Sequence, residues 1–163
     1  MITQSIIPCI WFEGDVEAIA EWYVSKFPDS FVDYTTKLTD TPSGETTVVT
    51  VSLAGQFCQL LGAGPLKERN PSISYMVTFP TSEEVETLWS ELIDGAEVLM
   101  PLDTYDFSER YGWLKDKHGV SWQIVPWEME EMLMTGTKEQ LARVTEAFLP
   151  MKKIDVATLR KVY

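Results

Sequence analysis

Hydrophobic and polar positions follow two different spacings along the first part of the chain, and the changes of spacing mark the predicted elements. Apolar side chains at helical spacing predict a helix from Val16 to Phe27, with Asp15 as its N-cap and Pro28 just beyond its end. Strands are expected at residues 5–12, 31–38, 45–53 and 56–62. The predicted order is therefore strand, helix, strand, strand, strand.

The same order recurs in the middle of the chain. Val85, Leu88, Trp89 and Leu92 form the apolar line of a second helix, which Thr81 or Ser82 caps. Strands are expected at residues 72–79, 96–102, 110–116 and 119–126, and a long loop at residues 102–110 separates the second of these from the third. This internal repeat predicts an α+β fold made of two βαβββ modules.

The last part of the chain changes character. Three short segments of helical periodicity follow Trp127 and predict a helical extension that packs on a sheet or on a second subunit. We therefore predict one domain at residues 1–127, with module one at 1–65 and module two at 66–127, followed by a helical C-terminal extension at 128–163.

Composition limits the kinds of partner that the protein is expected to bind. A formal charge of -12 disfavours binding to nucleic acid and to anionic membrane surfaces. No apolar run is long enough to span a membrane and no secretory signal is recognised, so a cytoplasmic protein is expected. Cys9 and Cys58 are both flanked by apolar or strand-forming residues, which predicts reduced, buried side chains, with a reactive thiol as the alternative.

Several sequence strings resemble one protein family over nearly the whole chain. They are PCIWFEGDVEAIAEWYVSKFPDS, AGQFCQLLGAGP, SEEVETLWSEL, GWLKDKHGVSWQIVP and MKKIDVATL. Together with the repeated element order, these strings resemble the PhnB-like group, often labelled 3-demethylubiquinone-9 3-methyltransferase. This group is part of the vicinal oxygen chelate superfamily, which includes glyoxalases, bleomycin-resistance proteins and dioxygenases.

The resemblance implies a glyoxalase-like fold in which two curved modules form a barrel of mixed sheets around a pocket, and it implies a homodimer. In metal-dependent relatives the first and last strands of each module supply His, Glu or Gln ligands. By position, the last strands here offer Gln59 and Gln123, and the opening strands offer no His, Asp or Glu. Because neutral amides are weak ligands for transition metals, no tightly bound catalytic metal and no other cofactor is expected.

Gln59, Gln123, Tyr105 and Trp113 are the candidate ligand-binding residues. The two glutamines either bind a ligand in the former metal position or satisfy neighbouring polar groups, and both interpretations stay open. Tyr105 lies in the polar and aromatic segment 102–110, which either gates the pocket or is a solvated connection. His118, the single histidine, lies between Asp116 and Gly119, which favours a solvent-facing turn over a catalytic role.

The preferred functional hypothesis is a metal-independent protein that binds a small organic molecule in the barrel pocket. The alternative is a superfamily enzyme, such as a lyase, isomerase or dioxygenase-like protein, either with a metal bound through ligands that the sequence does not reveal or with a carboxylate of the 102–110 segment as a base. A methyltransferase, as the family label states, is third. Conventional methyltransferases that use S-adenosylmethionine have a glycine-rich turn after the first strand. This chain has FEGDVEA there, with a single glycine.

Overall fold

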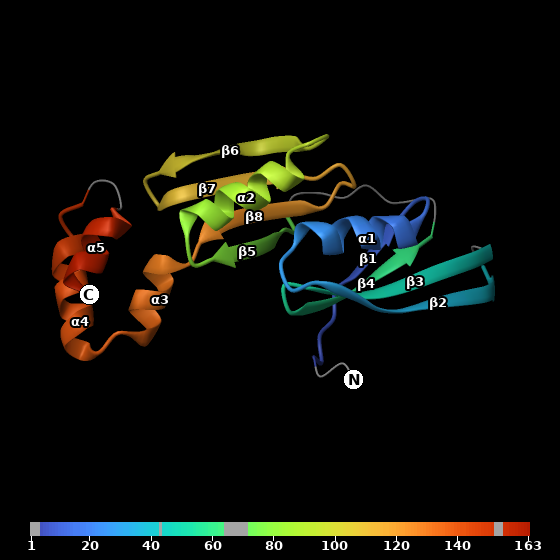
Figure 1. Ribbon diagram of the computed structural model, residues 1–163, viewed down its shortest axis with the longest axis horizontal. Helices are drawn as coiled ribbons and strands as arrows, with labels where there is room; N and C mark the ends of the chain where they lie inside the picture. Colours follow the sequence, from blue (N-terminus) through green and yellow to red (C-terminus); the bar gives the residue numbers. More distant parts are fainter. Residues whose placement is uncertain (1–3, 43, 64–71, 152–154) are drawn as a thin grey trace. The chain divides into compact units, whose positions relative to one another are not determined.

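A computed structural model describes residues 4–42, 44–63, 72–151 and 155–163. The chain forms two compact units, Met1–Glu68 and Arg69–Tyr163, and each unit contains one four-stranded sheet with helices (Figure 1). This is the predicted α+β fold of two βαβββ modules, but the described strands form two separate sheets and not the closed barrel that was expected. The segment AGPLKERNP lies almost entirely outside the described residues. No helix in the described ranges is long and apolar enough to cross a membrane.

The first unit has the predicted element order. Its elements are β1 (Cys9–Phe12), α1 (Val16–Lys26), β2 (Phe31–Thr41), β3 (Gly44–Leu53) and β4 (Gln56–Gly62). The sheet order is β1-β4-β3-β2, with β1 parallel to β4 and the other neighbours antiparallel. Asp15 caps α1 as predicted, because its carboxylate accepts hydrogen bonds from the backbone N–H groups of Glu17 and Ala18, each at 3.1 Å.

The two faces of this first sheet differ in burial. The face against α1 carries Phe12, Leu60 and Val51, all of which are buried. On the other face Cys9, Gln59, Thr50 and Tyr34 form one row across the four strands. Large apolar side chains on this open face are about half exposed, namely Trp11 (52%), Phe31 (49%), Tyr34 (44%) and Leu38 (43%).

The two cysteines occupy opposite faces of the first sheet. Cys58 is buried on the α1 side, as predicted, but the prediction that Cys9 is buried is wrong. Side chains alternate between the faces of a strand, so Cys9 points away from the helix while Phe12 points toward it. Apolar neighbours in the sequence therefore indicated a strand without indicating which residue is covered.

Burial of Cys58 makes the stability of the first unit fall at alkaline pH. It raises the pKa of the thiol from its ordinary value of 9.0 to about 11. Between these values the unfolded chain releases the proton while the folded chain keeps it, so stability that is present below pH 9 is lost as pH rises to 11. The expected loss from this group is roughly 2–3 kcal/mol.

Urea denaturation at several pH values between 9 and 11 measures the free energy of unfolding, with intrinsic fluorescence as the signal. Cys58→Ala should show a shallower alkaline decline than the native chain, and Cys9→Ala, the matched control, should follow the native chain. Parallel curves for native protein and Cys58→Ala would contradict the prediction.

The second unit repeats the architecture and adds the extension. Its elements are β5 (Tyr75–Phe79), α2 (Ser82–Leu92), β6 (Glu97–Tyr105), β7 (Ser108–Lys115), β8 (Ser121–Pro126), α3 (Glu128–Thr135), α4 (Lys138–Phe148) and α5 (Val156–Val162). The sheet order is β5-β8-β7-β6, with β5 parallel to β8. Thr81 is the N-cap of α2 and forms a capping box with Glu84.

The expected long loop at residues 102–110 is a tight β-hairpin. Strand β6 continues to Tyr105 and β7 begins at Ser108, so that only Asp106 and Phe107 connect them. The polar side chains of this segment resembled a loop, but they alternate with partly buried ones on the paired strands, as strand geometry requires. The hairpin therefore holds Phe107 and Ser108 at a defined place beside the sheet.

Helix α2 covers one face of the second sheet. Leu114, Trp122 and Ile124 are buried there, together with Val85, Leu88 and Leu92 of the helix. Gly112 lies on the same face, where a Cβ atom would come within 2.4 Å of the Trp89 ring. Since Trp122 packs on the helix side, its neighbour Gln123 must project from the opposite, open face.

His118 lies in the predicted turn between β7 and β8. The carboxylate of Asp116 accepts hydrogen bonds from the backbone N–H groups of His118 at 2.8 Å and Val120 at 3.0 Å, and Gly119 adopts a positive φ of 81°. The ring of His118 is partly buried instead of fully facing solvent. The turn interpretation is confirmed, and Asp116 is the residue that organises it.

The extension has a small core of its own. Buried side chains from its three helices meet in one cluster, namely Met132, Val144, Val156 and Leu159. In Figure 1 these helices lie beyond one end of the β5–β8 sheet instead of covering its face. The helices of the extension therefore pack mainly on one another, and they adjoin the sheet at one end of its strands.

Candidate functional site

The open face of the second sheet gathers side chains from three neighbouring strands. The strand register places Met76 of β5 and Trp113 of β7 directly beside Gln123 of β8. Tyr111 lies two residues before Trp113 on β7, and Val125 lies two residues after Gln123 on β8. Both therefore project from the same face as Gln123. This is the face that α2 does not cover.

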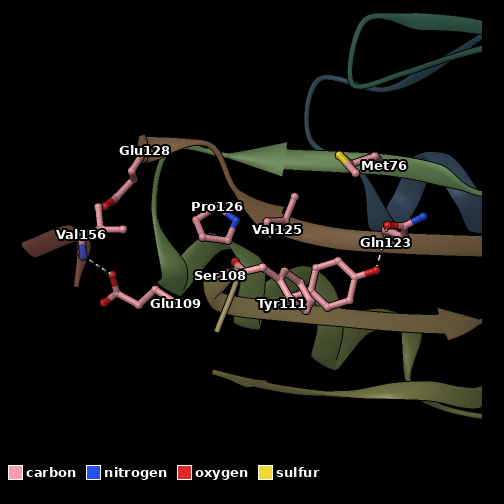
Figure 2. Close-up of a pocket in the computed structure, with 10 residues that line it drawn as sticks. Met76, Ser108, Glu109, Tyr111, Gln123, Val125, Pro126, Glu128 and Val156 are labelled. Atoms are coloured by element: carbon pink, nitrogen blue, oxygen red, sulfur yellow. Dashed lines mark hydrogen bonds between the residues drawn. The ribbon is translucent and has the colours of Figure 1, made fainter. Parts of the chain in front are cut away.

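A cavity of about 280 Å³ opens on this face and reaches the start of the extension (Figure 2). It is slightly smaller than the roughly 300–1,000 Å³ typical of sites for drug-sized molecules. The described residues that line it are Met76, Phe107, Ser108, Glu109, Tyr111, Gln123, Val125, Pro126, Glu128 and Val156. Apolar walls with a few polar groups are the usual composition of a site for a small organic molecule.

At one end of the cavity, the lining side chains of Tyr111 and Gln123 form a hydrogen-bonded chain with Ser74. The hydroxyl of Tyr111 donates to Oε1 of Gln123 at 2.8 Å, and Nε2 of Gln123 donates to Oγ of Ser74. Figure 2 shows the Tyr111 ring and the Gln123 amide meeting from adjacent strands. Because both ends of the amide are bound, its orientation is fixed before any ligand arrives.

Tyr111 remains a neutral phenol at physiological pH. Burial, followed by the neighbouring Tyr105 phenol, raises the pKa of Tyr111 above its ordinary value. The Phe107 ring meets the Tyr111 ring edge-on, with 5.2 Å between the ring centroids, and stacks on the Tyr105 ring, with 5.4 Å between the centroids. The Tyr111 hydroxyl therefore keeps its proton and donates it in a hydrogen bond to Gln123 from within an aromatic wall.

Two carboxylates lie at the other end of the cavity. Oε2 of Glu109 accepts a hydrogen bond from the backbone N–H of Val156 at 3.0 Å, as Figure 2 shows. Oε1 of Glu128, whose side chain is 17% exposed, lies 3.0 Å from Nη2 of Arg160. Burial raises the pKa of Glu128, the Arg160 charge opposes this rise, and three other carboxylates, beginning with Glu109, add to it.

The four predicted ligand-binding residues are placed differently. Gln123 lines the cavity, whereas Tyr105 and Trp113 are not among the described residues that do. Tyr105 supports the wall from behind Phe107 and donates its hydroxyl to the carbonyl of Pro101 at 2.8 Å. Trp113 faces the same side of the sheet as Gln123 but donates its indole N–H to Ser121 at 2.8 Å. Gln59 lies on the open face of the first unit, where it is partly buried.

The sequence did not single out Tyr111 or Glu128, and it pointed to Glu109 only as one carboxylate of the 102–110 segment. Tyr111 lies two positions before Trp113 on the same strand face, and strand alternation therefore pointed to it. Glu109 belonged to a segment interpreted as a loop. Glu128 begins the extension, for which the sequence offered no connection to the sheet.

The residues present do not fit the metal that the superfamily pattern implies. On the opening strands, Cys9 lies beside Gln59 and Met76 lies beside Gln123. Each pair combines a neutral amide with one sulfur atom and contains neither imidazole nor carboxylate, and the carbonyl oxygen of Gln123 already accepts from Tyr111. Among the residues that the structure describes, no three His, Cys, Asp or Glu side chains gather to hold a metal.

Two βαβββ units, each with a parallel pair of first and last strands, define the glyoxalase-like fold class. Solved structures have the same fold. A fosfomycin resistance protein, FosX, from Listeria monocytogenes has a TM-score of 0.57 at 16% identity over 77% of this chain and 94% of that one. A glyoxalase family protein from Bacillus cereus has a TM-score of 0.56 at 12% identity over 77% and 95%.

Within this class the chain belongs to the 3-demethylubiquinone-9 3-methyltransferase family, the PhnB-like group, whose model matches residues 4–125. A PhnB protein from Bacillus cereus, described as a candidate 3-demethylubiquinone-9 3-methyltransferase, is 32% identical over 76% of this chain and 99% of that one, with a TM-score of 0.68. No curated protein matches the sequence. The family resemblance predicted from the sequence is confirmed.

Proposed function

We propose that this protein binds a small organic molecule in the cavity of its second unit without a tightly bound catalytic metal. The observation that carries the proposal is the Ser74–Gln123–Tyr111 chain at the end of the cavity where the walls are apolar, opposite the carboxylates. Beyond the two bonds described, the amide of Gln123 retains one donor hydrogen and one acceptor lone pair. A fixed amide among apolar walls orients a ligand that pairs with it.

Thermal-shift screening of the full chain tests this proposal. The panel contains small metabolites, S-adenosylmethionine and aromatic antibiotics. A true ligand should stabilise the fold by mass action, by about 2.7 kcal/mol at a hundredfold excess over its Kd. Gln123→Met should weaken binding about tenfold or more, because Tyr111 and Ser74 then lose their partner.

Gln56→Met is the matched control, since Gln56 is exposed in the first unit and far along the chain from the cavity residues. Gln59→Met tests whether the equivalent position of the first module also contributes to binding. If no compound in the panel stabilises the native chain, or if Gln123→Met binds as tightly as the native chain, the proposal is wrong.

An enzymatic role is the second candidate, favoured by the carboxyl group of Glu128. A carboxylic acid whose pKa is raised by burial at the edge of a cavity is suited to general acid catalysis. Conversion of a bound ligand that is lost in Glu128→Gln while binding remains would favour an enzyme. Methyl transfer, which the family description names, requires S-adenosylmethionine to be the panel compound that binds.

We also propose that the protein is a cytoplasmic homodimer. Half-exposed aromatic side chains on the open face of the first sheet, such as Trp11 and Phe31, support association because they are more apolar than an ordinary free surface. Sedimentation equilibrium that returns the mass of one chain would overturn the dimer.

A further inference from the structure

We propose that the C-terminal extension makes the cavity selective for ligands that carry a cationic group, with Glu109 and Glu128 as the specificity-determining residues. This inference rests on the proposed binding function and adds the chemical class of the ligand. Three observations support it: the position of the carboxylates, the balance of charge around them, and the place of the extension in the chain.

The first observation is that the two carboxylates reach the same cavity from different elements. Glu109 is the second residue of β7, and Glu128 is the first residue of α3. Figure 2 shows both at the end of the cavity near Val156, opposite the Gln123 and Met76 end. A ligand that spans the cavity therefore meets an amide at one end and carboxylates at the other.

The second observation is that the charge near this end is negative in sum. The other described lining residues are neutral, so the charged groups of the lining are the two glutamates. Arg160 compensates for one of them through Glu128, but Glu83 and Glu131 also act on Glu128 with the same sign as Glu109. An ammonium or guanidinium group is attracted by this field, and a carboxylate or phosphonate group is repelled.

The third observation is that this end of the site lies partly outside the family match. The match ends at residue 125, and Glu128 and Val156 follow it. Nearly all of the Bacillus cereus PhnB protein aligns with 76% of this chain, so the remainder of this chain has no counterpart there. The amide end of the cavity thus belongs to the family part of the fold, and the extension adds the second carboxylate.

Glu109 connects these two parts. Its Oε2 atom accepts from the N–H of Val156, the first residue of α5, and thereby ties the extension to β7. One oxygen is used for this bond, so the same carboxylate still presents negative charge to the cavity. The ion pair of Glu128 with Arg160 of α5 fastens the extension a second time.

Three probes with one aromatic body and different charge test the inference on the full chain: 2-phenylethylamine, 2-phenylethanol and phenylacetate. By titration calorimetry the amine should bind about tenfold more tightly than the alcohol, and the acid more weakly than either, because charge complementarity is the main difference between them. Glu109→Gln and Glu128→Gln should each remove most of the advantage of the amine. Glu139→Gln, an exposed change on α4, should leave it intact.

Arg160→Gln separates charge from structure. Removal of the guanidinium leaves the cavity more negative, so the amine should bind several-fold more tightly, whereas a purely structural role of the Arg160–Glu128 pair predicts weaker binding. Weaker amine binding in folded Arg160→Gln, or alcohol binding equal to amine binding in the native chain, overturns the inference. If a neutral or anionic compound binds through Gln123, the proposed binding function survives without cation selection; if no compound of any charge binds, both fail.

Discussion

Replacing Asp116 by alanine should lower the free energy of unfolding of the second unit by about 3–5 kcal/mol. Asp116 is 3% exposed, and its carboxylate accepts three hydrogen bonds. Two come from the backbone N–H groups of His118 and Val120, and the third comes from the indole N–H of Trp122 at 2.8 Å. Each donor that stays buried without its acceptor costs about 1–3 kcal/mol.

Urea denaturation of the Asp116→Ala chain measures this loss. Asp94→Ala, at an exposed position of the same unit, is the control and should change stability by less than about 0.5 kcal/mol. Asp116→Asn should lie between the two, because its amide keeps one acceptor but turns an N–H group toward Trp122. A loss in Asp116→Ala as small as in Asp94→Ala would show that the turn does not depend on this carboxylate.

The turn also shows what the sequence could and could not predict. Asp at the start and Gly at the end of DKHG predicted its geometry, since both residues have local conformational preferences. The bond from Trp122 to Asp116 was not predictable, because it joins two side chains on the buried face of the sheet. The most conspicuous residue, His118, does not line the cavity, and the structural importance of the segment lies in its aspartate.

The candidate site was also predictable only in part. Repeat order and strand alternation indicated that Gln123 and Trp122 occupy opposite faces, and the burial of Trp122 against α2 decides which residue reaches the cavity. Gln123 was thus one of two residues that the sequence offered for the cavity, and its binding of a ligand stays a prediction. Glu128 was not offered, because its place beside Glu109 depends on how a helical extension meets the end of a sheet, and local periodicity contains no information on that packing.

The extension should unfold separately from the sheet when its small core is damaged. Leu159 is fully buried among Met132, Val144 and Val156, so Leu159→Ala should cost about 2–5 kcal/mol. A helical cluster of this size has little more stability than that to lose. Its few connections to the sheet include the hydrogen bond from Val156 to Glu109, which is too weak alone to hold the helices in place.

Hydrogen exchange measured by mass spectrometry distinguishes separate from joint unfolding. In Leu159→Ala, the amides of α3, α4 and α5 should lose their protection while those of β7 and β8 keep it, because local opening costs less than global unfolding. Lys161→Ala, an exposed change on the same helix, should leave both regions protected. Loss of protection in β8 together with α5 would mean that sheet and extension form one cooperative unit. Retained protection of β8 would mean that the amide end of the cavity persists when the extension, and with it the Glu128 carboxylate, is released.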